Sequence, residues 1–498
     1  MIDAHSILFD EPKIEFRYNQ LALTPKDGLT LFGPYDADLP SYPGTINYML
    51  IGAKTGIQKF KQWSLVANTP VIDSEFNQRL WPAFPGFKAV FGFDWPTIPV
   101  WEKELSNSKL LQASRKKDPH ERANEVVFQY LDAMKTLEKL DEKIGVIICV
   151  VPDEIFANCR PKSNPSDAIG KLIPKNRKQQ RKEGQKDLFD SFDADIYSYS
   201  VDFRRQLKAR SMKYGVPIQI IRESTLRLSD EKKFGERGLT PLSDRMWNLS
   251  IANYYKAGGK PWKLTSARDG VCYIGIAFRR TDDKRTACCA AQMFLQNGEG
   301  IVFLGEYGPW YSPKTKQFHL PKKAAKKLLS GILETYKQLG GKELAEIFIH
   351  SRSKISLEEY EGYKEATPSG INLTAIKVRL VTKHPPRLYR LGDMPVLRGT
   401  CWKINRKSAL FWGSGFKPRL ATYDGWDTPI PLRIDIDYGN SPIERVVQDI
   451  YGLTKLNYNS GKLGNNQPVT VAFSDAVGEI LISNPNISER KPNFKFYI

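Results

Sequence analysis

Residues 143–156 read KIGVIICVVPDEIF, and this apolar run is typical of a strand that is buried on both faces. Upstream, residues 120–140 show the apolar spacing of an amphipathic helix. Residues 48–54 and 56–68 predict a further strand and helix in the same order. Strands that alternate with helices in this way predict an α/β domain built on a parallel sheet.

The same pattern continues on both sides of this run. Residues 87–93, FKAVFGF, predict another strand. A helix is predicted from Phe203, followed by a strand over residues 216–222 and a helix that ends at residues 258–259, which are both glycine. Residues 160–189 are polar and basic, and we expect a mobile surface loop whose charges are solvated, with a nucleic-acid contact as the alternative.

A second unit is predicted from residue 266 onward. Three strands, a helix, a strand, a helix and a strand are predicted at residues 270–278, 287–295, 300–306, 321–341, 344–351, 356–366 and 375–381. This order resembles that of ribonuclease H. We therefore divide the chain into an arm (1–44), a Rossmann-like α/β domain (45–265) and a ribonuclease H-like α/β domain (266–498).

The arm contains turn formers, such as Pro25, Gly28 and Gly33, which predict short extended pieces. Two interpretations of its apolar residues stay open: they pack on the second domain, or a partner protein covers them. The residues concerned are Ile7, Leu8, Phe9, Leu29, Leu31 and Phe32.

Composition narrows the class of protein. The chain has 498 residues, 41% of them hydrophobic, which predicts two or three domains with buried cores. Its formal charge of +19 favours a polyanionic partner, although a merely basic soluble protein is the simpler alternative. Six cysteines without C-x-x-C spacing disfavour disulfides and structural zinc. Without a leader-like start or a long apolar run, we expect a cytoplasmic protein with no membrane contact.

One helix collects cations. Residues 203–213 hold five basic residues and no acid. Arg204 and Lys208 are four residues apart, so they share a helix face. Gln219 in the next strand and Lys256 near the end of a later helix could join them around one tetrahedral dianion. On spacing alone, a solvated basic helix is the simpler interpretation.

The same residues resemble a known site. Arg204-x-x-x-Lys208, then Gln219, then Lys256 within YYKAGGKPWKL resemble the pocket for the guide 5′-phosphate in the MID domain of Argonautes. The resemblance implies that the three cations neutralise the phosphate, and that Gln219 bonds the phosphate or a metal shell. Relatives often carry an aromatic residue where Arg204 stands.

The end of the chain resembles the end of a PIWI domain, through LTKLNYN (453–459), PVTVAFSDAVGEIL (468–481) and the last residues, KFYI. The family resemblance implies that the carboxylate of Ile498 and Gln219 hold Mg²⁺ beside the guide phosphate. It covers about residues 45–498 and lacks counterparts of the N-terminal and PAZ regions. The chain therefore resembles a short prokaryotic Argonaute.

A PIWI domain that cuts needs several carboxylates for two metal ions. Here Ala277 in YIGIAFRR and Ser351 in IFIHSRSK stand at two of the expected positions, and Asp475 stands at the last, after a strand expected over 468–473. We therefore expect no catalytic residue and no nuclease activity. His350 is interpreted as a structural group, and Cys288 and Cys289 as buried small hydrophobes rather than reactive thiols.

The resemblance implies a recognition protein rather than an enzyme. It implies a 5′-phosphorylated guide RNA, a complementary single-stranded DNA target from plasmid or phage, and a companion in which an APAZ region is fused to an effector. That effector is most often a TIR NAD hydrolase and otherwise sirtuin-like or a nuclease. Loss of NAD⁺ would serve antiviral defence by abortive infection, with assembly into a higher oligomer on target binding.

Three other hypotheses remain. The chain could be an active guide-directed nuclease, a single-strand nucleic-acid-binding module without sequence preference, or a structural subunit whose charge binds only its partner. The sequence leaves open the guide length, the 5′-base preference, the guide chemistry and the effector type.

Overall fold

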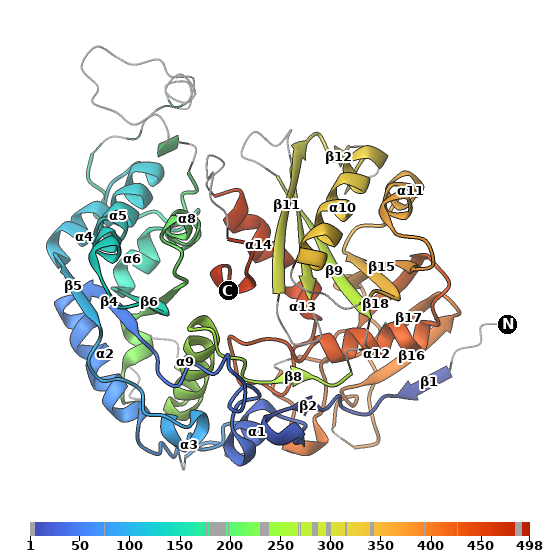
Figure 1. The fold of residues 1–498 in the computed structure, drawn as a ribbon, viewed down its shortest axis with the longest axis horizontal. Coiled ribbons are helices and arrows are strands. Elements are labelled where there is room, and N and C mark those ends of the chain that lie inside the picture. Colours follow the sequence, from blue (N-terminus) through green and yellow to red (C-terminus); the bar gives the residue numbers. More distant parts are fainter. Residues whose placement is uncertain are drawn as a thin grey trace.

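The computed structural model describes residues 5–498 with these exceptions: 74, 171, 173, 175–177, 179–195, 198, 230–238, 267, 269, 281–286, 295–299, 314–315, 339–342, 393, 426 and 484–490. Only the backbone is described at 280, 287–294, 304, 306, 307 and 475. Two units lie side by side, with the arm along one edge of both and the carboxyl terminus between them (Figure 1).

The first unit is a four-stranded parallel sheet of order β5-β4-β6-β7. Its strands are β4 (Tyr48–Ala53), β5 (Trp101–Leu105), β6 (Val146–Val151) and β7 (Ile218–Arg222). Its helices are α2 (Lys54–Ala67), α3 (Phe87–Phe91), α4 (Asn107–Ser114), α5 (Pro119–Met134), α6 (Asp153–Asn158), α8 (Phe203–Ser211) and α9 (Leu242–Lys256). The apolar run lies in β6, between two neighbours and buried throughout, as expected for a strand covered on both faces.

The prediction of a strand over residues 87–93 is wrong, because these residues form α3. Phe87, Val90 and Phe91 are buried at helical spacing. Gly86 and Gly92, at φ of 100° and 85°, bound the short helix on either side. The buried residues recur every three to four positions, which is the period of a helix, although the segment is as apolar as a typical buried strand.

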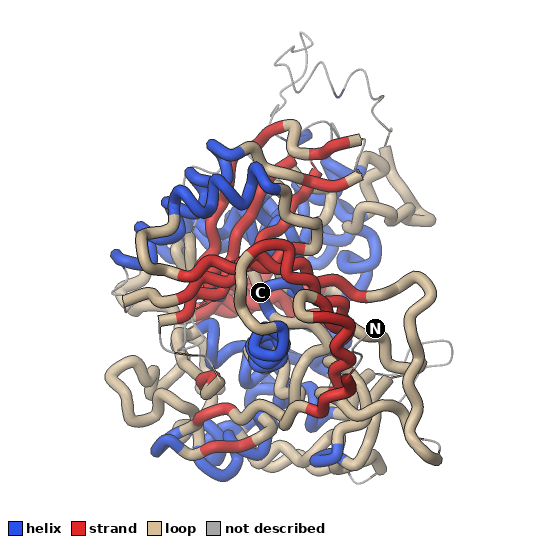
Figure 2. The backbone as a smooth tube through the Cα atoms, turned by 90° about the vertical axis from the view of Figure 1, so that its right-hand side faces the viewer, coloured by secondary structure: helices blue, strands red, loops and turns tan. Residues whose placement is uncertain are grey.

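The second unit is a nine-stranded sheet of order β1-β16-β17-β18-β15-β14-β9-β10-β11 (Figure 2). Its strands are β1 (His5–Leu8), β9 (Val271–Arg280), β10 (Ala287–Phe294), β11 (Gly300–Gly308), β14 (Glu346–Ser351), β15 (Asn372–Leu380), β16 (Thr400–Asn405), β17 (Ser408–Phe411) and β18 (Leu432–Tyr438). Its helices are α10 (Lys322–Gln338), α11 (Leu357–Ala366), α12 (Ile443–Leu453), α13 (Val469–Ala472) and α14 (Ser474–Leu481).

The part β11-β10-β9-β14-β15 has the predicted ribonuclease H order, with β14 parallel to both β9 and β15. Successive residues of β9 serve two cores. Cys272 and Ile274 pack with α10, whereas Val271 and Tyr273 join the core that contains α12. The sheet is thus covered on both faces. Because β9, β14 and β15 run parallel to one another, their carboxyl ends lie at one edge of the sheet.

The strand expected over residues 468–473 is also wrong, because α13 and α14 occupy this segment. Pro468 precedes the first helical residue, where a missing N–H costs nothing. The backbone of α13 lies against β9 so closely that a Cβ on Gly275 would come within 2.0 Å of the Thr470 carbonyl oxygen. The segment resembles a buried strand in sequence because Val469, Thr470 and Val471 are β-branched, and all three are buried in the helix.

The arm contains a helix that the turn formers did not predict, α1 (Pro25–Phe32). Thr24 caps it by accepting a hydrogen bond from the backbone N–H of Asp27 at 3.0 Å. Gly28 lies inside this helix because its Cα faces the Phe16 ring, where a Cβ would lie 2.0 Å from a ring carbon. A short strand, β2 (Ile14–Glu15), pairs with β3 (Leu21–Ala22) on one side and with β8 (Lys263–Leu264) on the other.

The arm packs on the core through part of its apolar surface. Leu29 is buried, and Ile7, Phe9 and Phe32 pack against the main core. Leu8 and Leu31 stay 57% and 70% exposed, so the alternative of a covering partner stays open for these two. No helix in the described part of the chain is long and apolar enough to cross a membrane.

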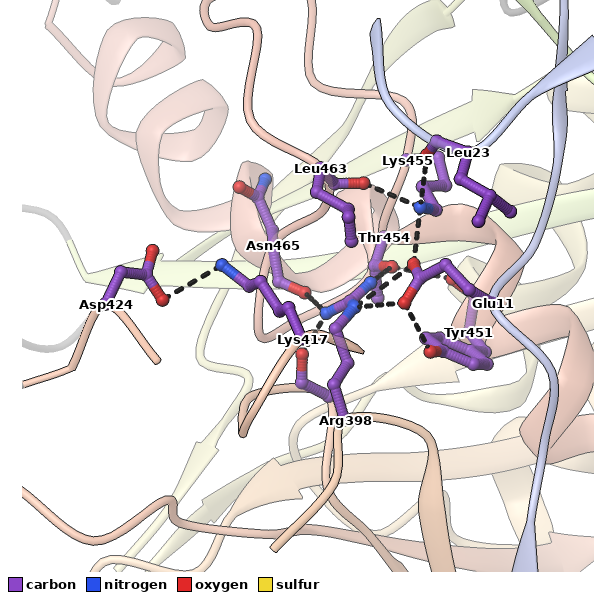
Figure 3. A network of polar contacts seen from close by, with 11 residues as sticks. Glu11, Leu23, Arg398, Lys417, Asp424, Tyr451, Thr454, Lys455, Leu463 and Asn465 are labelled. Carbon is purple, nitrogen blue, oxygen red and sulfur yellow. Dashed lines mark hydrogen bonds and ion pairs between the residues drawn. The ribbon is translucent and has the colours of Figure 1, made fainter. Parts of the chain in front are cut away.

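A buried ion cluster clamps the arm to the second unit (Figure 3). Glu11 bonds Arg398 Nε at 3.0 Å and the hydroxyl of Tyr451 at 2.7 Å, and it also contacts Lys455. The side chains of Arg398 and Lys455 are fully buried. Burial alone would raise the pKa of Glu11, but the two cations lower it below its ordinary value.

We expect Glu11→Gln to lower the free energy of unfolding in urea by about 3 kcal/mol, because two buried cations would lose their carboxylate. The matched control is Glu102→Gln, which removes an exposed pair with Lys61. That change should cost less than about 1 kcal/mol. Equal losses in the two variants would contradict the clamp.

Candidate functional site

A cavity of about 400 Å³ lies between α8 of the first unit and α14 of the second. Its lining is rich in cations and comes from α6, α8, α14 and the chain's last residues. It comprises Phe156, Arg160, Pro161, Asp202, Phe203, Arg204, Arg205, Lys208, Ala476, Glu479, Ile480 and Tyr497.

Helix α8 presents two of the predicted cations to this cavity. Asp202 caps the helix by accepting a hydrogen bond from the backbone N–H of Arg205 at 3.1 Å. Arg204 and Lys208 both line the cavity, as their spacing predicts. Arg204 is exposed, whereas Lys208 is 4% exposed. The helix therefore carries one cation in contact with solvent and one in the interior.

Lys208 contacts the end of the chain. Its Nζ donates to the main-chain oxygen of Ile498 at 2.5 Å and to that of Tyr497 at 3.3 Å. The segment is held from the other side too, because the N–H of Val302 in β11 donates to the Pro492 carbonyl at 2.7 Å. The last residues thus connect α8 with the edge of the large sheet.

The other two predicted residues bond each other. Lys256, at the end of α9, donates to Oε1 of Gln219 in β7 at 2.5 Å. Neither of them lines the cavity, but the charge of Lys256 lowers the pKa of Lys208 in α8. The structure therefore brings Arg204, Lys208, Gln219 and Lys256 into one region, with Ile498 beside Lys208.

Burial shifts the pKa of both lysines. Burial lowers the pKa of Lys256 to about 7, and the charge of Arg204 adds to the effect. Burial lowers the pKa of Lys208 well below its usual range, with Arg204 and Lys256 contributing. Within the described residues, the bonds to these lysines come from main-chain oxygens and an amide, not from a carboxylate side chain. Such an arrangement favours an incoming anion.

Sequence reasoning missed three residues of the lining. The guanidinium of Arg160 lies 4.0 Å from the centre of the Phe156 ring. Glu479 of α14 bonds Arg205 at 2.7 Å and Arg279 of β9 at 3.4 Å, so it joins the two units. Phe156 could have been found, because α6 begins directly after the carboxyl end of β6, the usual ligand edge of a parallel sheet. No local pattern marks Glu479.

The predicted catalytic positions lie at the carboxyl ends of neighbouring strands. Ala277 is in β9 and Ser351 ends β14, with Ser351 opposite Ile276. Both are buried. Asp475 is the second residue of α14, and its side chain lies outside the described part of the structure. Among described residues, no group of three or more His, Cys, Asp or Glu could hold a metal ion.

His350 behaves as the structural group that was expected. It is 1% exposed, and its Nδ1 lies 2.8 Å from Oγ1 of Thr470 in α13. Burial lowers its pKa to about 3, so the ring is neutral at ordinary pH. The side chains of Cys288 and Cys289, and most of residues 171–195, lie outside the described part, so those predictions stay predictions.

Both predicted Mg²⁺ donors are bonded by lysines in this arrangement. The Gln219 oxygen accepts a hydrogen bond from Lys256 Nζ, and the Ile498 oxygen accepts one from Lys208 Nζ. A divalent cation could use these two oxygens only by displacing both lysines from them. The magnesium site stays a prediction.

Comparisons with known proteins support the fold. No family model matches the chain. It is 23% identical over 283 residues to the protein argonaute of Aquifex aeolicus (strain VF5), covering 55% of this chain and 35% of that protein. It is similar to Clostridium butyricum Argonaute bound to a guide DNA and a 19-mer target DNA, with TM-score 0.65, 15% identity, 99% of this chain and 55% of that chain.

A second solved relative is Aa-Ago with externally bound siRNA, with TM-score 0.57, 15% identity, 99% of this chain and 56% of that chain. The chain thus spans about a third of the curated relative and about half of the solved chains. The predicted fold class, a Rossmann-like unit followed by a ribonuclease H-like unit, is confirmed.

We expect Lys256→Met to raise the free energy of unfolding by about 1–3 kcal/mol at neutral pH, because it removes a buried charge without a carboxylate partner. The gain should be full below about pH 7 and fade towards pH 10, since only the unfolded lysine is charged in between. Lys455→Met is the control: burial lowers the pKa of that lysine to about 7 too, but its loss would leave the buried Glu11 with one cation fewer, so it should destabilise. Destabilisation by both changes would contradict this account.

Proposed function

We propose that this chain holds the 5′-phosphate of a short guide strand and recognises complementary single-stranded nucleic acid through base pairing with that guide. The observation that carries the proposal is the buried pair Lys208 and Lys256. Among the described residues they bond oxygens of Tyr497, Ile498 and Gln219, and none of these oxygens belongs to an Asp or Glu side chain. A terminal phosphate supplies up to two negative charges and three acceptor oxygens, which such a site lacks.

Anchoring follows from the geometry. The phosphate enters the cavity beside the exposed Arg204, which attracts it from solvent. Its charge raises the pKa of Lys208 and Lys256, so both bind protons. Lys208, which lines the cavity, then holds the anion by charge-assisted bonds, and Lys256 adds its charge from outside the lining. Gln219 keeps Lys256 oriented through its existing bond. The ring of Phe156, backed by Arg160, offers a face on which the first base can stack.

Specificity then comes from the guide. A protein that grips a strand end and its backbone needs no base-reading side chains, because Watson–Crick pairing selects the target. The excess of 74 Lys and Arg over 55 Asp and Glu supplies backbone affinity that falls as salt rises. The C. butyricum relative was solved with a guide DNA and a target DNA, and Aa-Ago with an externally bound siRNA. For this chain we propose an RNA guide and a DNA target.

The proposed role is recognition without cleavage. Ala277 and Ser351 stand where a metal-holding PIWI edge would need acids, and neither side chain can bind a metal as a carboxylate does. Recognition must then be signalled to another protein. We propose a companion with an APAZ region and an effector, most often a TIR NAD hydrolase, in cytoplasmic immunity against plasmids and phages. The exposed Leu8 and Leu31 of the arm support such docking.

The proposal predicts a preference for the 5′-phosphate. The chain should bind a 5′-phosphorylated single strand at least about tenfold more tightly than its 5′-hydroxyl counterpart. Lys208→Ala should remove most of this preference and leave affinity for the 5′-hydroxyl strand nearly unchanged. Fluorescence anisotropy at fixed salt measures both strands.

The control is Lys213→Ala, an exposed cation just beyond the same helix, which should weaken both strands equally and slightly. Equal affinity of the unaltered protein for the two strands would refute the guide proposal and favour a single-strand module without end recognition. If Lys208→Ala keeps the preference for the 5′-phosphorylated strand, the phosphate does not bind in this cavity.

Magnesium stays a proposal, because an ion bound here must take the Gln219 and Ile498 oxygens from the two lysines. We expect chelation of divalent ions to change affinity for the phosphorylated strand less than about twofold, since lysines already neutralise the phosphate. In parallel, guide-loaded protein with Mg²⁺ or Mn²⁺ should leave labelled target intact. A large loss on chelation would restore the metal, and guide-directed cuts would identify a nuclease.

A further inference from the structure

The cavity between α8 and α14 holds a carboxylate as well as cations. Ala476, Glu479 and Ile480 recur at helical spacing on α14, so one face of this helix lines the cavity together with α8 (Figure 1). Oε2 of Glu479 lies 2.7 Å from Nη2 of Arg205 in α8. The two side chains are 27% and 35% exposed, so both are in contact with solvent in the cavity.

Arg205 belongs to the same lining as two cations of the proposed phosphate site. It follows Arg204 directly and precedes Lys208 by three residues, and all three line the cavity. A guanidinium offers paired donors in a plane that fits a phosphate. The ion pairs of Arg205 are with Glu479 at 2.7 Å and with the helix cap Asp202 at 3.9 Å. Arg205 therefore has the chemistry to bind a phosphate, but carboxylates share its charge.

Glu479 is held from a second side as well. Its Oε1 lies 3.4 Å from Nη2 of Arg279 in β9. The Arg279 side chain passes directly over Gly478, where a Cβ would come within 2.7 Å of the arginine Cγ. Because this second cation stays beside it, Glu479 can release Arg205 without becoming an isolated carboxylate.

We propose that Arg205 is a further phosphate-binding residue, and that the 5′-phosphate of the guide displaces Glu479 from it. Two anions compete for one guanidinium, and the phosphate carries up to two charges where the carboxylate carries one. Loading thus exchanges a contact between the two units for a contact with the guide. Glu479 stays on Arg279 and disfavours weaker anions, so it makes the site selective for a phosphate. This inference rests on the proposed function.

The test measures the affinity of the full-length protein for a single RNA strand with and without a 5′-phosphate, by fluorescence anisotropy at fixed salt. Glu479→Gln should tighten binding of the phosphorylated strand about fivefold, because it frees Arg205 and removes a repelling charge. The affinity for the 5′-hydroxyl strand should stay nearly unchanged. No tightening, or equal tightening for both strands, overturns the inference.

A second variant, Arg205→Gln, tests whether the two residues compete. It should weaken binding of the phosphorylated strand in the unaltered protein and in the Glu479→Gln background. The loss should be about threefold larger in the Glu479→Gln background, where the carboxylate no longer holds Arg205 back from the phosphate. Equal losses in the two backgrounds overturn the inference, because Arg205 and Glu479 would then act independently.

The matched control is Glu444→Gln, which removes a carboxylate of similar exposure that pairs with Lys403 elsewhere in the second unit. It should leave both affinities unaltered. Unfolding in urea measures the stability of each variant. If Glu479→Gln weakens binding of both strands and lowers the free energy of unfolding, the inference is overturned and Glu479 only holds the two units together.

The two proposals fail in distinguishable ways. If the unaltered protein and Glu479→Gln both bind the two strands equally, the guide proposal fails, and this inference fails with it. If the unaltered protein prefers the phosphorylated strand and Glu479→Gln gains nothing, only the role given to Arg205 and Glu479 fails.

Discussion

The account depends on a charge imbalance at the seam between the two units. Lys208 and Lys256 are 4% and 2% exposed, and burial lowers the pKa of each. Burying lysines in such a place costs stability, because the folded chain must either desolvate their charge or hold them neutral, and a bound anion offsets that cost. In the described part of the chain, oxygens of Tyr497 and Ile498 and one amide orient the lysines, and no Asp or Glu side chain bonds them. A strand end with a phosphate completes the site.

Another buried lysine, Lys455, is held in a different way. Lys455 is buried as deeply, and burial lowers its pKa to about 7, but Glu11 reaches across from the arm to pair with it. Arg398 and Tyr451 complete that cluster. Nearby, Nε1 of the buried Trp262 donates a hydrogen bond to the Lys455 carbonyl at 3.0 Å. The motif at residues 453–459 therefore helps to hold the two units together. Among the described residues, Lys455 has a side-chain carboxylate as partner, whereas Lys208 and Lys256 do not, and this difference separates a structural lysine from the candidate site.

The sequence predicted what local pattern encodes. The run in β6, the ribonuclease H strand order and the shared face of Arg204 and Lys208 all follow from periodicity. Two helices were misassigned. In α1, Gly28 was taken for a turn former, although it lies inside the helix against the Phe16 ring. In α13, the β-branched residues favoured a strand by propensity. The hairpin of β16 and β17 was overlooked, although alternating residues flank a tight turn there. Glu479, which joins the units, depends on tertiary contact alone.

The most direct test is the number of protons taken up when a 5′-phosphorylated strand binds. Calorimetry at about pH 8 in two buffers of different ionisation enthalpy gives this number. Lysines held neutral by burial must regain charge beside a phosphate, so the account predicts uptake of about one proton or more per strand. A 5′-hydroxyl strand should take up almost none. Equal uptake for both strands, or none for either, would contradict the claim that these lysines form the phosphate site.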